Sequence, residues 1–193
     1  LMTRHHLTTL ACTLALIAPL ALSTAQAQDR FKVAVGQINN WENQAPTLGE
    51  AIFRKHNLVL ENFGTAGAGE TMQPVISASA DFGAGVGVAG VMRAFERGAP
   101  VRIFLPMFTG TGDIYWYVRG DSPIKSLKDA TERHTIAYST SGSTSNNTVL
   151  AFINDLGAKA KPTATGGPAA TLTAVMSGQI DIGWSAPPFG LQE

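Results

Sequence analysis

Cysteine is nearly absent from this sequence. The one cysteine among 193 residues is Cys12, which lies within an apolar N-terminal run. The rest of the chain therefore forms no disulfide and has no thiol nucleophile, which excludes a small disulfide-stapled scaffold. A chain of this length without cross-links must depend on an apolar core, and a hydrophobic content of 45% is enough to supply one.

Charge is also scarce. Charged residues make up 15% of the sequence, and the formal net charge is zero. Beyond residue 27, the 14 Lys and Arg residues lose only Arg4, so 13 basic residues face 14 acidic ones and the net charge is −1. No basic stripe or polybasic run is present, which disfavours binding to nucleic acid or to a membrane surface. We therefore expect no nucleic-acid partner.

Familiar catalytic motifs are missing. The chain contains no G-x-S-x-G elbow, no H-E-x-x-H zinc motif and no P-loop. The only histidines after residue 27 are His56 and His134, and each stands beside charged residues, which is typical of the surface. Asp81 and Asp181 are interpreted as residues that pin the turns before two strands. We predict no catalytic residue, no metal site and no cofactor.

The one long apolar run is at the N-terminus. Leu7–Leu22 is interrupted by Pro19 and is shorter than the ~20 residues that a membrane-spanning helix needs. Arg4 and two histidines precede the run, and Ala25-Gln26-Ala27 supplies a small-x-small cleavage site. A membrane anchor is the alternative. We predict that residues 1–27 are a cleaved signal peptide and that the protein is exported to the periplasm.

One sequence pattern occurs twice in the chain, about a hundred residues apart. Thr65-Ala-Gly67-Ala-Gly69 leads to Asp81-Phe82-Gly83, and Thr165-Gly166-Gly167 leads to Asp181-Ile182-Gly183. The residues between them also recur, as Thr71, Val75 and Ser77 in the first copy and Thr171, Val175 and Ser177 in the second. Each copy predicts a Gly-rich turn, an amphipathic helix and a short buried strand. Solenoid repeats recur every ~20–50 residues, so this longer spacing indicates two similar lobes.

Strand and helix patterns alternate along the chain. The first half predicts strands over Phe31–Gly36, Leu58–Phe63, Ala80–Gly83 and Val101–Phe108, and helices over Gln44–His56, Glu70–Ala78 and Val88–Arg97. The second half predicts strands over Ile114–Arg119 and Thr135–Tyr138 and a helix over Ser143–Leu156, before the second copy of the repeat. This alternation indicates an α/β fold with parallel sheets. The break at Thr109–Gly112 divides the chain into a first lobe, residues 28–110, and a second, residues 111–193.

Open α/β sheets bind ligands beyond the carboxyl ends of their strands, where loops meet helix N-termini. The strongest single segment is Ser139–Thr144, because its small residues let backbone N–H groups approach a ligand and its hydroxyls add donors. An ordinary helix cap in a polar loop is the alternative. The other segments that qualify are Gln37–Trp41, Thr65–Gly69, Gly83–Gly87, Gly166–Gly167 and Trp184–Pro187.

Gly85–Gly90 fits the G-x-G-x-x-G fingerprint of dinucleotide-binding domains. The acidic residue expected about 20 positions later is absent, because Val101–Phe108 is apolar and Thr109 follows it. We therefore interpret these glycines as a close-packed strand–helix turn that lines a cleft. Trp41 and Trp184 also fall at cleft positions, where stacking on a ligand and buried packing are equally plausible, whereas Trp116 lies in an apolar strand and is expected in the core.

Several of these segments resemble one known family. Phe31–Gly36, Asp81–Gly83, Arg119–Asp129 and Ser139–Ser143 are similar to the periplasmic solute-binding proteins of ABC importers, in the branch that groups sulfonate, nitrate and thiamine-precursor binders. Ser177–Gly183 strengthens the resemblance, which covers nearly all of the chain after residue 27. It implies a type II periplasmic-binding-protein-like fold, in which two hinged lobes, each a mostly parallel sheet flanked by helices, close on one small solute.

The resemblance also implies a function. We expect an extracytoplasmic binding component that captures a small, anionic organic solute without turnover and delivers it to a membrane permease, as a monomer. The alternatives are an enzyme of the same fold in thiamine-precursor synthesis and a ligand-sensing domain. The expected ligand-binding residues come from the loops of both lobes: Gln37, Asn40, Trp41, Gly67, Ala68, Gly85, Val86, Ser141, Gly142, Ser143, Thr144, Gly167 and Trp184.

The C-terminal end departs from the family pattern. The chain stops at Pro187–Glu193 with no closing helix, whereas members of the family return to the first lobe after the second. We expect the chain to be incomplete at its C-terminus.

Overall fold

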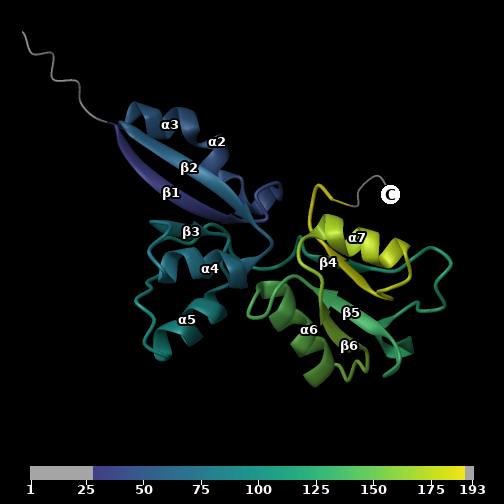
Figure 1. The fold of residues 1–193 in the computed structure, drawn as a ribbon. Helices are drawn as coiled ribbons and strands as arrows, with labels where there is room; N and C mark the ends of the chain where they lie inside the picture. Colours follow the sequence, from purple (N-terminus) through teal and green to yellow (C-terminus); the bar gives the residue numbers. More distant parts are fainter. Residues whose placement is uncertain (1–27, 190–193) are drawn as a thin grey trace, which may run out of the picture.

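The structure is a computed structural model and describes residues 28–189. Two α/β lobes lie side by side, the first built from the purple to teal part of the chain and the second from the green to yellow part (Figure 1). The predicted signal peptide and the last four residues lie outside the described residues. None of the helices between residues 28 and 189 is long and apolar enough to cross a membrane.

The first lobe is a parallel sheet of three strands. Its order is β2-β1-β3, with β1 (Asp29–Gly36) paired along its whole length with β2 (Leu58–Thr65) and at its end with β3 (Phe82–Ala84). Val33, Ala34 and Val35 are fully buried, as expected for a central parallel strand covered on both faces. The helices of this lobe are η1 (Trp41–Asn43), α2 (Ala45–Leu48), α3 (Glu50–Lys55), α4 (Ala68–Ile76) and α5 (Val88–Glu96).

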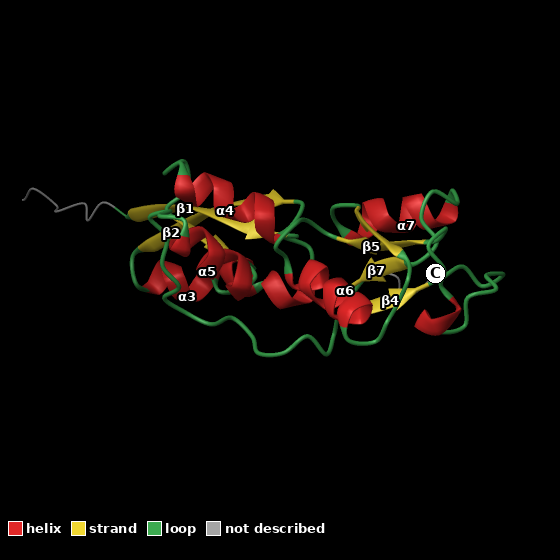
Figure 2. Cartoon of the chain, turned by 90° about the horizontal axis from the view of Figure 1, so that it is seen from below, coloured by secondary structure: helices red, strands yellow, loops and turns green. Residues whose placement is uncertain are grey.

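The second lobe has two pairs of strands, β5-β6 and β4-β7, joined by a single bridge. β5 (Thr135–Tyr138) pairs in parallel with β6 (Lys161–Ala164), and a parallel bridge between Ile136 and Ile182 joins β5 to the segment that enters β7 (Gly183–Ser185). β7 in turn pairs antiparallel with β4 (Tyr115–Tyr117). The helices are η2 (Leu127–Asp129), α6 (Thr144–Asn154) and α7 (Pro168–Met176), and helices flank the strands of both lobes (Figure 2).

The core of the second lobe confirms the expectation for Trp116. This side chain packs edge-on against Phe152 of α6, with 4.9 Å between the ring centroids, and its indole N–H donates to the carbonyl of Ala137 over 2.9 Å. It packs against a cluster of buried residues that includes Ile136 and Val149, neither of which is exposed.

The repeated pattern forms the same local structure twice. Thr65 and Thr71 share a hydrogen bond of 2.6 Å between their hydroxyls, and Thr165 and Thr171 do the same at 2.6 Å. The hydroxyls of Thr71 and Thr171 also donate to the carbonyls four residues earlier, over 3.0 Å in each copy. These contacts fasten the Gly-rich turn to the first turn of α4 in one lobe and of α7 in the other.

The two repeated aspartates pin neighbouring strands, as expected. Asp81 Oδ2 accepts from the backbone N–H of Lys32 over 2.7 Å. Asp181 Oδ2 accepts from the backbone N–H of Thr135 over 2.8 Å and from its hydroxyl over 2.9 Å. Each carboxylate therefore ties the turn before the last strand of its repeat to the central strand of its own lobe.

Three elements differ from the sequence predictions. The helix predicted over Gln44–His56 is two short helices that meet at Gly49, where Ala45 and Phe53 leave no room for a side chain. Val101–Phe108 is not a strand, because it makes no backbone hydrogen bonds to a neighbouring strand; instead Phe104 packs edge-on against Phe82. β6 was not predicted, since its sequence Lys-Pro-Thr-Ala carries a proline, which is tolerated only at a sheet edge.

Candidate functional site

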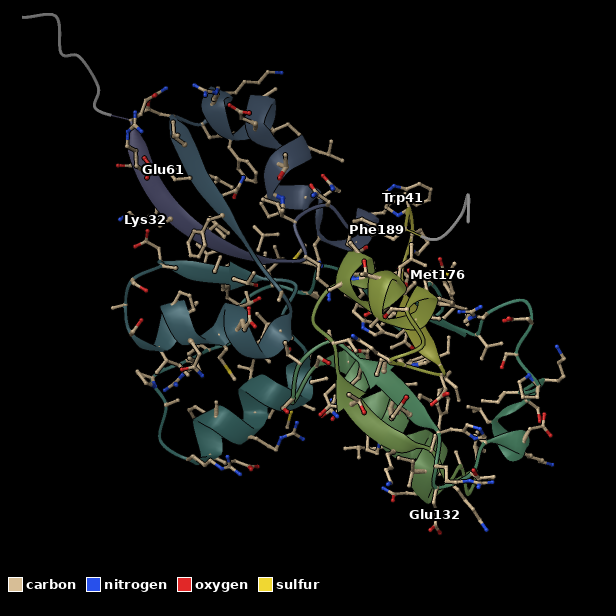
Figure 3. All side chains as sticks on the ribbon, turned by 45° about the vertical axis from the view of Figure 1, so that its right-hand side comes forward. Lys32, Trp41, Glu61, Glu132, Met176 and Phe189 are labelled. Atoms are coloured by element: carbon tan, nitrogen blue, oxygen red, sulfur yellow. The ribbon has the colours of Figure 1, made fainter. Side chains whose placement is uncertain are left out.

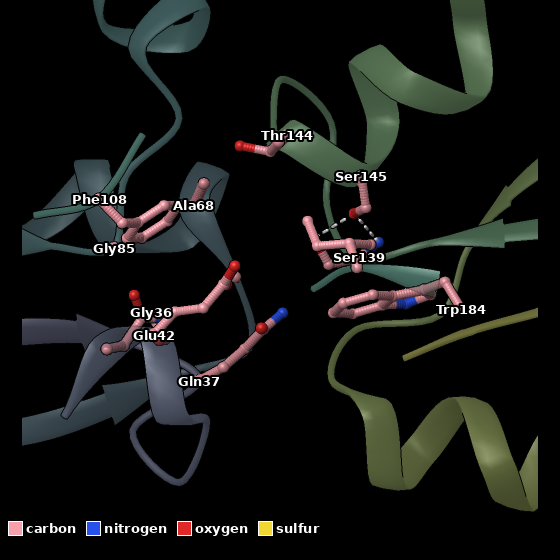
Figure 4. Close-up of a pocket in the computed structure, with 13 residues that line it drawn as sticks. Gly36, Gln37, Glu42, Ala68, Gly85, Phe108, Ser139, Thr144, Ser145 and Trp184 are labelled. Atoms are coloured by element: carbon pink, nitrogen blue, oxygen red, sulfur yellow. Dashed lines mark hydrogen bonds between the residues drawn. The ribbon is translucent and has the colours of Figure 1, made fainter. Parts of the chain in front are cut away.

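A cavity lies between the two lobes, with about 410 Å³ of space not filled by atoms, part of it open to solvent. The first lobe contributes the loops after β1 and β3, η1 and the start of α4, whereas the second contributes the loop after β5, the start of α6 and β7 (Figure 4). Its thirteen lining residues are Gly36, Gln37, Glu42, Asn43, Gly67, Ala68, Gly85, Phe108, Ile114, Ser139, Thr144, Ser145 and Trp184.

Two helix N-termini meet at this cavity. α4 begins at Ala68 after the N-cap Gly67, and α6 begins at Thr144 after the N-cap Ser143. The N-terminal end of a helix carries a partial positive charge and N–H groups without intrahelical partners. An anionic group between the lobes would therefore face one such end from each side.

Buried hydroxyls hold the loop of the second lobe in place. Ser145 Oγ accepts from the backbone N–H of Ser139 over 3.0 Å, and it lies 3.0 Å from the hydroxyls of Ser139 and of Ser143. All three side chains are buried, and Ser143 also caps α6 by accepting from the N–H of Asn146 over 3.0 Å. Because each hydroxyl is engaged within the loop, this segment presents its cavity face in one fixed geometry.

Glycines let the two lobes touch beside the cavity. The N–H of Gly69 donates to Thr140 Oγ1 over 3.0 Å, across the gap between α4 and the loop after β5. A Cβ added to Gly90 would lie 2.9 Å from the carbonyl oxygen of Gly142, and one added to Gly87 would lie 3.2 Å from the backbone nitrogen of Thr144. Side chains at these first-lobe positions would hold the lobes apart, so we name Gly67, Gly69, Gly87 and Gly90 the glycine seam.

Glu42 is the only ionisable side chain among the thirteen lining residues. Burial, together with a hydrogen bond to Asp113 and the negative charge of that neighbour, raises the pKa of Glu42 to about 8. Three buried polar atoms of the lining have no hydrogen-bond partner within residues 28–189: Glu42 Oε1, Asn43 Oδ1 and Trp184 Nε1.

Three large apolar side chains line the cavity. Trp184, only 2% exposed, faces Trp116 across the β4–β7 pair and lies at the second-lobe wall. Phe108 and Ile114 come from the segment that joins the lobes. A concave site with apolar walls and a few convergent polar groups suits a small organic molecule.

The structure places some of the thirteen sequence-predicted residues in the lining of the cavity and the others outside it. Those that line the cavity are Gln37, Gly67, Ala68, Gly85, Thr144 and Trp184, and those that do not are Asn40, Trp41, Val86, Ser141, Gly142, Ser143 and Gly167.

The predicted residues outside the lining have identifiable structural surroundings. Asn40 is buried and accepts from the N–H of Glu42 over 3.0 Å, whereas Trp41 is 62% exposed. Gly142 and Ser141 contact the glycine seam through their carbonyl oxygens. The rest lie against their own lobe: Val86 beside Gly83, Ser143 as the α6 cap and Gly167 as the α7 cap.

Sequence reasoning did not select seven residues of the lining. Ser139 belongs to a loop that the sequence did indicate, and Ser145 follows that loop by one residue. Gly36 and Glu42 each adjoin the predicted loop Gln37–Trp41, but a single acidic residue carries no motif. No sequence signal places Asn43, Phe108 or Ile114 at the site, because their positions depend on how the lobes meet.

No family model matches the chain, and no curated protein matches it. Solved structures do. A protein of Bordetella bronchiseptica RB50 superimposes with a TM-score of 0.66 at 21% identity, over 84% of this chain and 52% of that one. The alkanesulfonate-binding protein SsuA of Xanthomonas axonopodis pv. citri, bound to MOPS, gives a TM-score of 0.58 at 14% identity, over 85% and 56%. The periplasmic aliphatic sulphonate binding protein SsuA of Escherichia coli gives 0.50 at 18%, over 83% and 55%.

These similarities show the fold. The chain has the two-lobed α/β architecture of type II periplasmic binding proteins, as the sequence predicted. It spans about half the length of the solved proteins it matches.

Proposed function

We propose that this chain is the solute-binding part of an ABC importer, and that it captures a small organic anion in the cavity between its lobes. The observation that carries this proposal is the meeting of two helix N-termini, one from each lobe, at a cavity lined by Trp184. A ligand held from both walls stabilises the closed arrangement, which is the form that a transporter can distinguish from the open one.

The anion is held by hydrogen bonds rather than by an ion pair. None of the thirteen lining residues is Lys or Arg, so the partial charges at the starts of α4 and α6, with the hydroxyl of Thr144, supply the attraction. Sulfonate, carboxylate and nitrate groups all present several acceptor oxygens that suit such donors. The sulfonate-binding proteins of similar fold favour sulfonate as the first choice to test.

Binding without turnover is supported by the chemistry of the lining. The cavity holds no His, Cys or Lys side chain, and the hydroxyls of Ser139 and Ser145 are hydrogen-bonded to each other rather than to a base. A nucleophile needs an adjacent base or a lowered pKa. The proposal also includes export with cleavage of the leader, a periplasmic location, a monomeric state and delivery to a membrane permease.

A thermal-shift panel tests this function. The purified chain is heated with alkanesulfonates, aminoalkanesulfonates, carboxylates, aminocarboxylates, nitrate and pyrimidines, each at several concentrations. A ligand at a hundredfold excess over its Kd adds about 2.7 kcal/mol to the free energy of unfolding and raises the melting temperature accordingly. We expect at least one sulfonate or carboxylate to do so. A folded chain whose melting temperature no member of the panel raises would contradict the proposal.

A further inference from the structure

The cavity carries a feature that a simple anion does not explain, because its one ionisable side chain is acidic. We propose that the solute also bears a protonated amine that binds Glu42, so that the ligand is an amino-substituted organic anion. This inference rests on the proposed function and specifies its ligand class.

The position of Glu42 is fixed by its neighbours. Asn40 is buried, and its Oδ1 accepts from the backbone N–H of Glu42 over 3.0 Å. On the other side Asn43 is buried, and its Nδ2 donates to the carbonyl of Gly36 over 2.5 Å. From this clamped turn the Glu42 side chain extends with Gln37 toward the second-lobe wall (Figure 4).

Two acceptor oxygens of the first-lobe wall have no donor. Glu42 Oε1 and Asn43 Oδ1 are both buried, both belong to lining residues, and neither has a hydrogen-bond partner among residues 28–189. A buried acceptor without a donor is unfavourable, and a ligand ammonium brings three donors. An anionic oxygen at the same place would instead be repelled by the negative charge of the neighbouring Asp113.

The two ends of the ligand are therefore assigned to different parts of the cavity. The anionic end lies between the starts of α4 and α6, beside Thr144 and the serine network, and the amine faces Glu42. The apolar side chains of Phe108, Ile114 and Trp184 lie around the same cavity, and they suit the short carbon chain that joins the two ends. Because burial and Asp113 raise the pKa of Glu42, an ammonium that binds beside it would favour the ionised carboxylate and release its proton.

Two pairs of ligands of matched size test the inference by isothermal titration calorimetry. One pair is 3-aminopropane-1-sulfonate and butane-1-sulfonate, and the other is 4-aminobutanoate and pentanoate; within each pair an ammonium replaces a methyl group. We expect the amino member of at least one pair to bind the wild-type chain at least tenfold more tightly than its alkyl partner. Glu42→Gln should abolish this preference but retain binding of the alkyl partner.

The controls separate the possible failures. Glu132→Gln changes an exposed acid at the far end of the second lobe and should keep the preference (Figure 3). If Glu42→Gln lowers the melting temperature, the preference of the wild-type chain within each pair still tests the inference. A second variant, Asp113→Asn, then tests the acidic side of the cavity. Equal or tighter binding of the alkyl member in both pairs overturns this inference alone. Binding of no ligand in either pair also overturns this inference, whereas the proposed function is contradicted only when no member of the thermal-shift panel binds.

Discussion

The backbone N–H of Gly69, at the start of α4 in the first lobe, donates a hydrogen bond to Thr140 Oγ1 in the second lobe over 3.0 Å. The contact is possible because Gly69 has no side chain: a Cβ there would lie 2.8 Å from the carbonyl oxygen of Ser141. Together with the glycine seam, it shows that the structure holds the lobes closed at the edge of the cavity.

Replacing Thr140 by Val should weaken ligand binding without unfolding the chain. The substitution removes the acceptor for Gly69 but keeps the shape of the side chain, and a single hydrogen bond contributes about 0.5–1.5 kcal/mol. We expect the Kd of the best ligand to rise about threefold to tenfold. Calorimetry measures the change, with Thr163→Val as the control, because the Thr163 hydroxyl bonds only within β6. An unchanged Kd for Thr140→Val would show that this contact does not contribute to closure.

Gly90→Ala should hold the lobes apart. The added Cβ would lie 2.9 Å from the carbonyl oxygen of Gly142, and the helix α5 itself should gain from the change because alanine is the better helix former. We expect at least a tenfold loss of ligand affinity and a larger radius of gyration by small-angle X-ray scattering, without a loss of helix content. Gly112→Ala is the matched control, since nothing lies within 4 Å of the added Cβ. An unchanged radius and affinity would contradict the role of the seam.

The two copies of the repeat should respond alike to mutation. Thr71 and Thr171 are fully buried, and each hydroxyl bonds to a threonine six residues earlier and to a carbonyl four residues earlier. Replacing either by Val leaves those partners without it, which we expect to cost about 1–3 kcal/mol in the free energy of unfolding. Urea denaturation measures the loss, and Thr173→Val, on the exposed face of α7, should change stability by less. A loss in one copy only would show that the repeats are not equivalent.

Stability should fall as the pH rises from about 4.5 to about 8, through Glu42. Its pKa is raised to about 8 by burial and then by Asp113, so the folded state holds a proton that the unfolded state releases near the ordinary value of 4.5. A raised folded-state pKa gives a contribution that is fully present below about 4.5 and is lost as the pH passes through about 8. We expect the melting temperature to fall across this range more steeply in the wild type than in Glu42→Gln. Parallel curves for the two proteins would refute the assignment.

The framework of the fold could be predicted from the sequence because it depends on local patterns. Val33–Val35 form an apolar run bounded by Gly36, and the Thr-Gly turns with an aspartate about sixteen residues later recur in both lobes. Each such pattern specifies its own strand or helix. Val101–Phe108 has the same apolar character, but a strand also needs a hydrogen-bonding neighbour, and the sequence of a segment does not say whether one is there.

The site could be predicted only in part, for the same reason. Gly67 and Thr144 were indicated by helix starts, which are local features. Ser141 and Gly142 belong to the right loop, but their carbonyls contact the seam, and this depends on how closely the lobes approach. Glu42 carried no motif, because an acidic residue in a short turn is usually on the surface, and its place at the cavity depends on how the lobes meet.

Tryptophan fluorescence offers the most direct test of the central claim that a small solute binds between the lobes. Trp184 lines the cavity and is buried, Trp116 lies in the core of the second lobe, and Trp41 is exposed outside the lining. The best ligand of the thermal-shift panel is titrated into the wild type and into Trp41→Phe and Trp184→Phe. We predict a saturable change in emission in the wild type and in Trp41→Phe that is lost in Trp184→Phe. A change that survives Trp184→Phe but disappears in Trp41→Phe would place the ligand outside the cavity and contradict the account.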